Sequence, residues 1–248
     1  MQAPIVFILS WERPLYLWAC LDSLRTQTKT ACRFVLLDND SQDPLVHRII
    51  ESFEARDLFH KVHRRKENSP HALMEAVREH QDEIGEYFGF VENDVVVLPS
   101  QPCWLEEFQR LTAADPKLSM LGSLIDKSDF IDPVWAAQRF KGLPEKQLEF
   151  LTKSKSAERA LADHYDEELI DVINPPGRLM FLRTEVILRT GMLPDYRLSL
   201  AMKELGYKCG IASRVRHRHL SLANAFDYPE YDQVGRDAFF RRLVHEKR

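Results

Sequence analysis

The sequence predicts an α/β protein with a mixed, mostly parallel sheet and helices on both of its faces. One observation is that short apolar runs, such as Ile5–Leu9 and Phe34–Leu37, alternate with segments of helical periodicity. Strands that alternate with helices form parallel sheets, because each helix packs back against the sheet. A second observation is that polar residues follow each apolar run. Since ligands bind such sheets at the carboxyl ends of the strands, these polar tips predict a site.

The composition is that of an ordinary globular protein. The chain has 248 residues, 44% hydrophobic and 29% charged, which suits one α/β domain or two small ones. The net charge of -4 gives no general reason to expect nucleic-acid or membrane binding. No apolar stretch approaches the roughly 20 residues that span a membrane. The cysteines lack the spacing of a zinc site, so we expect free thiols and a cytoplasmic protein: Cys20, Cys32, Cys103 and Cys209.

The first half of the chain repeats the strand–helix unit. Pro14 suits the first turn of a helix, whose apolar face is predicted from Leu17, Trp18, Leu21 and Leu24. After the strand 34–37, Asp43 and Pro44 predict an N-cap and a first helical residue. A short strand is expected at 59–62, and a helix is expected to start at Ser69-Pro70. The polar tips of these units are residues 10–12, 38–41, 67–68 and 92–94.

The second half is less regular. Strands are expected at 118–125, 177–182 and 209–212. Thr184 is expected to cap a helix that ends near Gly191, and a further helix is expected from Asp195 to Gly206. The polar segment 126–170 is interpreted as a helical insertion that covers the site. The tail 222–248 is mixed and amphipathic.

An isolated acidic pair lies between two apolar runs. Glu92 and Asp94 interrupt the stretch 88–98, where burial of carboxylates is costly unless a cation or hydrogen-bond donors satisfy them. Hard divalent cations are held by one or two carboxylates together with substrate phosphates. The alternative is an acidic surface turn between two strands.

The order of these motifs resembles that of the family 2-like glycosyltransferases of the GT-A fold. Asp38-Asn39-Asp40-Ser41 is similar to the family's "DN-x-S" element, and Glu92-Asn93-Asp94 occupies the place of its DxD motif. Residues 177–183, 190–195 and 216–221 match later motifs in order. The resemblance implies one domain over 1–221, with a nucleotide-sugar half at 1–98 and an acceptor half at 99–221.

The resemblance also assigns roles to the polar tips. It implies that Asp38 accepts a hydrogen bond from the base N–H of a pyrimidine such as uracil. It also places Asn68 in a loop that commonly contains Asn in this family. Ser10 and Trp11 belong to the polar turn after the first strand, where Trp11 lies against base or ribose or belongs to the core. Arg178 is expected to bind the diphosphate or an anionic acceptor, or to be a surface ion-pair partner. The same alternatives apply to Arg183.

The implied cofactor is Mg²⁺ or Mn²⁺. Asp94 is the expected metal ligand, and Glu92 contacts ribose or binds the metal through water. His219 is the expected third ligand. His217 competes for that role, since a strand would point both histidines the same way. The alternative is a basic surface cluster.

The resemblance implies that Asp195 is the general base of an inverting transfer, although an Asp at a helix start is also a preferred cap. Two departures from the family pattern, Pro194 before this residue and Arg197 after it, keep open a degenerate domain that binds without turnover. A nucleotidyltransferase is disfavoured because the turn 10–13 lacks glycine. The acceptor stays open among glycans, lipid-linked sugars, proteins and modified bases in DNA. The basic clusters at 64–66, 214–218 and 241–248 keep the DNA alternative open, while the net negative charge counts against it.

Overall fold

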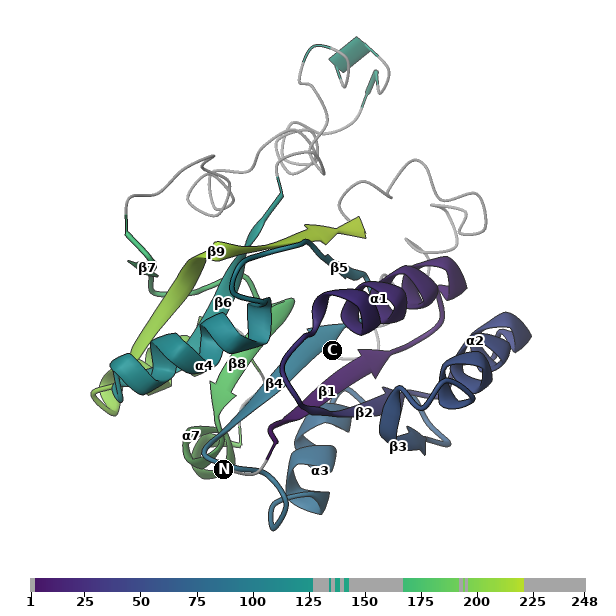
Figure 1. Ribbon diagram of the computed structural model, residues 1–248, viewed down its shortest axis with the longest axis horizontal. Coiled ribbons are helices and arrows are strands. Elements are labelled where there is room, and N and C mark those ends of the chain that lie inside the picture. The colour runs from purple at the N-terminus through teal and green to yellow at the C-terminus, as the bar shows by residue number, and fades with distance from the viewer. Residues whose placement is uncertain are drawn as a thin grey trace.

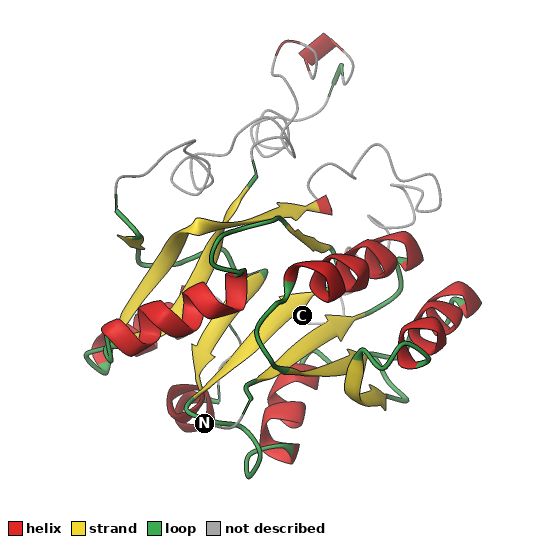
Figure 2. Ribbon diagram, viewed as in Figure 1, coloured by secondary structure: helices red, strands yellow, loops and turns green. Residues whose placement is uncertain are grey.

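A computed structural model describes residues 3–126, 134, 137–138, 141–142, 167–191, 194 and 196–220. Within these residues the chain forms one twisted sheet with helices on both faces (Figure 1), which confirms the predicted fold class. The strands lie in the middle and the helices outside (Figure 2). Most of the predicted insertion 126–170 and all of the tail 222–248 lie outside the described residues.

The bounds of the elements agree with most of the predicted units. The strands are β1 Ile5–Ser10, β2 Arg33–Asp38, β3 Phe59–Arg64, β4 Tyr87–Glu92, β5 Val95–Val97, β6 Leu118–Ile125, β7 Leu169–Asp171, β8 Leu179–Arg183 and β9 Lys208–His219. The helices are α1 Pro14–Gln27, α2 Pro44–Glu54, α3 Ala72–Glu79, α4 Trp104–Ala114, α7 Thr184–Thr190 and α8 Tyr196–Glu204.

The sheet is mixed, and its main path runs β3-β2-β1-β4-β8-β6-β9-β5, with β7 paired to β9. β1, β2, β3, β4, β6 and β9 run in one direction, and β5, β7 and β8 run against them. The carboxyl ends of six strands therefore reach one edge of the sheet. The amino end of β8 reaches that same edge.

Two hydrophobic clusters fill the space between the sheet and its helices. α1, α2 and α4 contribute to the cluster on one face, and α3, α7 and α8 contribute to the cluster on the other. Trp18 was expected in the core with Leu17, but it is 49% exposed, whereas Leu17 is fully buried. The buried face of α1 is formed by Leu17, Cys20, Leu21 and Leu24, and Trp18 lies outside it.

The start of α2 shows how local sequence sets an element. The Asp43 carboxylate accepts a hydrogen bond from the Leu45 N–H at 2.8 Å, and Pro44 occupies the first helical position. This arrangement confirms the predicted cap, which satisfies one of the otherwise unpaired donors of the first turn. By contrast, α3 begins at Ala72, two residues after the predicted Pro70.

Two predicted element boundaries in the second half were wrong. β9 does not end at Ala212 but continues to His219, because its second part pairs with β5 as well as β6. Thr184 does not cap α7 but is its first residue, and its hydroxyl donates to the Gly85 carbonyl at 2.7 Å. On α8, Leu198 is fully buried, whereas Leu200 is 38% exposed. The helix α4 and the strand β7 were not predicted.

Candidate active site

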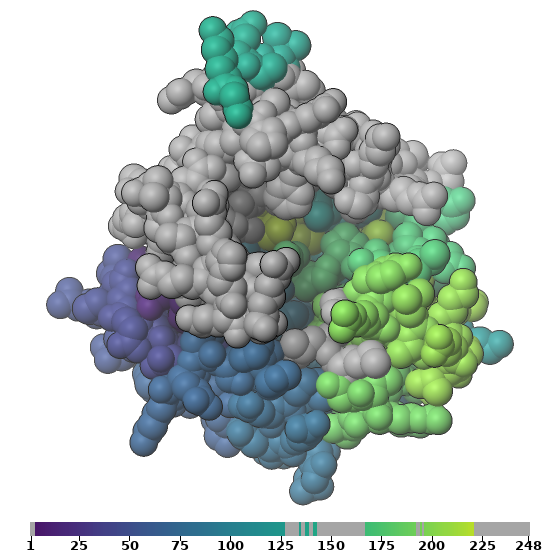
Figure 3. Space-filling view, turned by 180° about the vertical axis from the view of Figure 1, so that it is seen from behind, coloured from purple at the N-terminus to yellow at the C-terminus, as the bar shows by residue number. Residues whose placement is uncertain are grey.

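The predicted polar tips converge at the carboxyl edge of the sheet. Ser10 ends β1 and pairs in register with Asp38, which ends β2, while Glu92 ends the other neighbour, β4. Arg178 precedes β8 at this edge, and His219 ends β9 nearby. Figure 3 shows a hollow between the purple-to-blue N-terminal half and the green C-terminal half, with atoms of β8 and β9 at its floor.

Asp94 lies in the turn between β4 and β5 and is nearly buried. Its Oδ2 lies 3.3 Å from Nε2 of His219 and 3.3 Å from Nη1 of Arg13. The pairing of β5 with β9 places Val95 opposite His219, which brings this histidine to the carboxylate. Asp94 and His219 have side chains only 5–6% exposed. Their burial makes a compensating cation favourable.

Glu92 forms an ion pair with Arg178, which joins the end of β4 to the start of β8. Burial raises the pKa of Glu92, Arg178 opposes this rise, and the neighbouring Asp94 adds to it. Burial lowers the pKa of Arg178, but the carboxylates of Glu92 and Asp94 outweigh it, and the net shift is upward. Arg178 therefore carries its positive charge into the site, beside both acids of the motif.

His217 lies below His219 on the same face of β9 and is fully buried. Its Nδ1 lies 2.7 Å from the Ser123 hydroxyl oxygen, and within the described chain its Nε2 has no hydrogen-bond partner. Burial lowers the pKa of His217 to about 3, so the ring is neutral near pH 7. His219 contacts Asp94, whereas His217 contacts Ser123.

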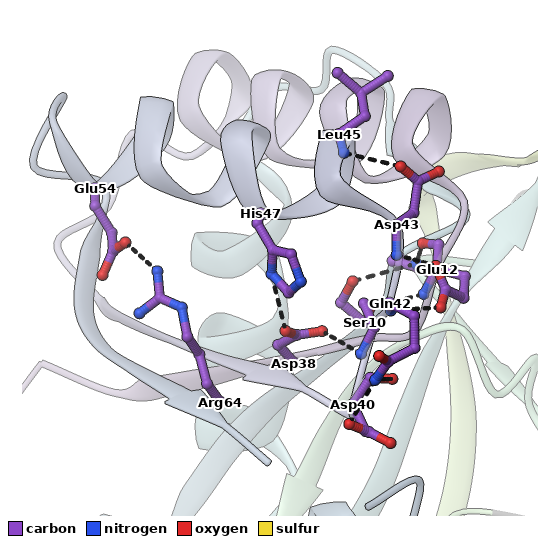
Figure 4. Close-up of polar contacts among 12 residues, drawn as sticks. Ser10, Glu12, Asp38, Asp40, Gln42, Asp43, Leu45, His47, Glu54 and Arg64 are labelled. Atoms are coloured by element: carbon purple, nitrogen blue, oxygen red, sulfur yellow. Dashed lines mark hydrogen bonds and ion pairs between the residues drawn. The ribbon is translucent and has the colours of Figure 1, made fainter. Parts of the chain in front are cut away.

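Asp38 is buried at the end of β2 and faces the start of α2 (Figure 4). Its Oδ1 accepts from the Ser41 N–H at 3.3 Å, and its Oδ2 lies 3.9 Å from Nδ1 of His47. The carboxylate is thus held by the turn that follows its own strand.

Asn68 lies in the exposed loop after β3, and Asn39 binds this loop to the tip of β2. The Asn39 Nδ2 donates to the side-chain oxygen of Asn68 and to the Ser69 carbonyl, and the Ser69 N–H donates back to the Asn39 Oδ1 at 3.1 Å. The structure therefore joins the loop of Asn68 to the residue that follows Asp38. That residue is Asn39, for which no role was predicted.

The turn between β1 and α1 is held by hydrogen bonds to two other loops. The Glu12 carboxylate accepts from the backbone N–H groups of Gln42 at 2.6 Å and Asp43 at 3.2 Å (Figure 4). Asn93 donates from the acidic motif to the carbonyls of Trp11 and Glu12, at 3.4 and 3.1 Å. Trp11 is half-buried in this turn.

The roles of Glu12 and Asn93 were missed because no local pattern marks them. Both act through backbone groups from distant loops, and the chain must fold before those groups meet. The only local signal was the polar turn before Pro14, which predicts a helix start and no more.

Arg183 takes no part in this edge of the sheet. It ends β8 opposite Tyr87, so it lies at the far edge, where it contacts Glu86 at 2.5 Å, the Tyr87 hydroxyl and the Pro116 carbonyl. Of the two alternatives raised for Arg183, the structure supports the ion-pair partner.

Asp195, the predicted general base, lies outside the described residues. Its neighbours on both sides are described. α8 begins at Tyr196, and the carbonyl oxygen of Pro194 lies 3.5 Å from an ideal Cβ position on Gly177. This contact brings Pro194 next to the residue that precedes Arg178.

The donor set at Asp94 fits a divalent cation in part. Adjacent ligand atoms on an octahedral ion with bonds of about 2.1 Å lie about 3 Å apart, and the two facing atoms of Asp94 and His219 lie 3.3 Å apart. Across the described ranges no group of three His, Cys, Asp or Glu side chains is arranged to hold a metal. The remaining positions would fall to water and to substrate phosphates, as is usual for Mg²⁺.

The sequence profile of glycosyl transferase family 2 matches residues 5–174, which is more than half of the chain. The chain belongs to glycosyl transferase family 2. This match confirms the family predicted from the order of the motifs. No curated protein sequence matches the chain.

Solved structures of glycosyltransferases share the fold of this family 2 chain. GalNAc-T7 with UDP, GalNAc and Mn²⁺ superposes with a TM-score of 0.61 at 14% identity, over 88% of this chain and 44% of that protein. The mannosyltransferase PcManGT from Pyrobaculum calidifontis, with GDP-Man and Mn²⁺, superposes with a TM-score of 0.59 at 14% identity, over 89% of this chain and 57% of that protein. S. aureus TarS 1–349 with UDP-GlcNAc superposes with a TM-score of 0.56 at 16% identity, over 93% of this chain and 63% of that protein.

The family 2 chain is thus shorter than these proteins and spans less than two thirds of each. Among the helices that the structure describes, none has the length and apolar character needed to cross a membrane.

Proposed function

We propose that this chain transfers a sugar from a nucleotide-sugar, a UDP-sugar in the first instance, to an acceptor hydroxyl, with Mn²⁺ or Mg²⁺ and with inversion at the anomeric carbon. The observation that carries this proposal is the buried contact between Asp94 and His219 at the carboxyl edge of a family 2 domain. Neighbours of the same fold hold UDP or GDP-Man together with Mn²⁺.

Asp94 and His219 would hold the metal, and Glu92 would contact ribose or a metal-bound water. A bound divalent cation supplies charge stabilisation for the diphosphate leaving group. Arg178 adds a second positive charge at the same place, since it lies between the motif and the opening of β8. Such preorganised charge acts on the transition state without the cost of reorienting water.

The tips of the first two strands would hold the nucleoside. Asp38 would accept from the base, and its loop is fixed to Asn68 through Asn39. Ser10 and Trp11 line the turn between this loop and the acidic motif. Asp195 would then take the proton from the acceptor hydroxyl as its oxygen attacks the anomeric carbon.

The contacts of the described arginines favour an uncharged acceptor over DNA. Arg64 pairs with Glu54, Arg65 pairs with Glu75, and Arg214 pairs with Glu168 at 2.7 Å. Because these charges are compensated within the chain, they form a weak surface for phosphates. A DNA acceptor would instead be indicated by acceptor binding that weakens steeply with salt.

Calorimetric titration of UDP, with Mn²⁺ and then with EDTA, tests the donor site. Binding that requires the metal supports the proposal, and GDP is the matched comparison because one neighbour holds GDP-Man. Metal-dependent GDP binding without UDP binding would change the donor. The absence of binding for both would contradict the metal-dependent site. Tight binding without transfer or hydrolysis would favour the degenerate domain, for which Pro194 and Arg197 are the sequence features.

A further inference from the structure

Arg13 approaches the acidic motif from a backbone conformation that is unfavourable for its residue type. Glu12 and Arg13 both have positive φ, 50° and 61°, although neither is glycine. Left-handed conformations of non-glycine residues cost about 1 kcal/mol or more each and persist only where other contacts impose them. Here the contacts are those of Glu12 with the start of α2 and of Asn93 with the Glu12 carbonyl.

This turn directs a cation at the predicted metal ligand. Nη1 of Arg13 lies 3.3 Å from Oδ2 of Asp94, and that same oxygen faces Nε2 of His219. The Arg13 side chain is 22% exposed, while Asp94 is 5% exposed, so the pair is largely shielded from water. In such a site an uncompensated carboxylate is strongly unfavourable.

A metal ion and this guanidinium compete for one oxygen atom. A divalent cation ligated by Oδ2 would lie within a few ångströms of Arg13, and like charges at that separation repel strongly when they are shielded from water. The incoming nucleotide supplies two or more phosphate charges, and guanidinium groups bind phosphate well. Arg13 therefore has a second partner available when a metal–nucleotide complex enters.

We propose that Arg13 is a positioning residue that neutralises Asp94 in place of the metal and releases it when the metal–diphosphate complex binds. Arg13 lowers the affinity of the empty site for free metal, and it restores that affinity when the diphosphate gives its guanidinium another anion. Metal and nucleotide binding are thereby coupled. This inference rests on the proposed function, because it takes Asp94 as the metal ligand.

The test measures Mn²⁺ affinity with and without UDP, by electron paramagnetic resonance of free Mn²⁺, in the wild type and in R13Q. Without UDP, R13Q is expected to bind Mn²⁺ roughly five- to 150-fold more tightly than the wild type, the usual range of coupling between two binding events. The gain in Mn²⁺ affinity on adding UDP is expected to shrink in R13Q. Equal Mn²⁺ affinities without UDP would overturn the inference.

Two further variants separate charge from other effects. R13K keeps the cation and is expected to bind free Mn²⁺ as weakly as the wild type, so tight binding by R13K would also contradict the inference. R25Q is the matched control, because Arg25 is an exposed residue of α1 that pairs with Asp22 on the same helix. R25Q should behave as the wild type does.

A measurement on the unaltered protein does not depend on how the variants fold. With ¹⁵N-labelled arginine, the Arg13 Nε–H resonance, assigned through R13K, should shift when Mg²⁺ and UDP are added together. An unmoved resonance in a protein that binds Mg²⁺–UDP would show that Arg13 stays on Asp94. The inference about Arg13 would then fail, while the proposed function would stand. If the wild type binds no metal–nucleotide complex, it is the proposed function that fails.

Discussion

Nε2 of His219 lies 3.3 Å from Oδ2 of Asp94. This contact joins β9, the last described strand, to the turn after β4. The contact follows from the register of two antiparallel strands, in which Val95 is opposite His219. Three side chains of the site thereby come from separate parts of the chain: Arg13, Asp94 and His219. Their meeting point is where we place the metal.

Replacement of Asp94 by asparagine tests that placement directly. The amide keeps the shape but removes the negative charge that attracts a divalent cation. We expect Mn²⁺-dependent UDP binding to be lost and transfer to fall by about 10²-fold or more, since a metal contributes several kcal/mol to a charged transition state. Calorimetry and a transfer assay measure the two effects. The control is D22N, because Asp22 is half-buried on α1 and pairs with Arg25 on the same helix. Unchanged metal dependence in D94N would exclude this residue as the ligand.

Asp195→Asn separates catalysis from donor binding. A general base contributes about 10²- to 10⁴-fold to a rate, and its loss leaves the nucleotide contacts intact. Transfer is therefore expected to fall within this range while the Kd for UDP with Mn²⁺ stays the same. D171N, at an exposed position on β7, is the matched control. Full activity of D195N would mean that the base is another residue.

Gly122→Ala is expected to disturb the loop that carries Arg178. An ideal Cβ on Gly122 would lie 2.8 Å from Cβ of Pro175 and 3.0 Å from the Pro176 carbonyl oxygen. Because backbone must move to relieve these contacts, we expect a loss of about 1–3 kcal/mol in the free energy of unfolding, together with weaker UDP binding. Urea denaturation and calorimetry measure both.

The control for this substitution is Gly85→Ala, since a Cβ at Gly85 meets nothing within 4 Å. G85A should leave UDP binding unchanged. If G122A is as stable as the wild type and binds UDP equally well, the close approach of the 175–176 segment does not position Arg178.

The stability of the fold is expected to fall in mild acid through a histidine pair away from the site. Nε2 of His63 and Nε2 of His80 lie 2.9 Å apart, and His80 is 1% exposed. Burial lowers the pKa of both rings, and Lys61 lowers each further. The unfolded chain, with pKa values near 6.5, then binds protons that the folded chain does not.

The free energy of unfolding is therefore expected to decrease as the pH falls below about 6.5, the pKa of histidine in the unfolded chain. Each fully linked proton contributes about 1.4 kcal/mol per pH unit to the free energy of unfolding. Urea denaturation between pH 8 and pH 5.5 measures the slope. H63Q should reduce the slope, whereas H71Q, at an exposed position, should keep it. An unchanged slope in H63Q would show that this pair is not responsible.

The order of strands and helices along the chain was readable from the sequence because it depends on local periodicity and caps. Asp43-Pro44 predicts the start of α2 correctly, and the apolar run before Glu92 predicts the end of β4. The boundary of β9 was not predictable in this way. Residues 213–219 contain one apolar residue, Val215, and the segment is held in a strand by partners on β5 and β6.

The sequence by itself determined the alternation of buried strands and helices, the polar tips at strand ends and the family. These features depend on neighbours a few residues apart, so a linear pattern records them. Only the tertiary structure decided which tips meet. It selected His219 for Asp94, set Arg183 at the opposite edge, and brought Arg13 to the acidic motif. Such contacts depend on strand order and register, which arise only when distant segments pair to bury their apolar faces.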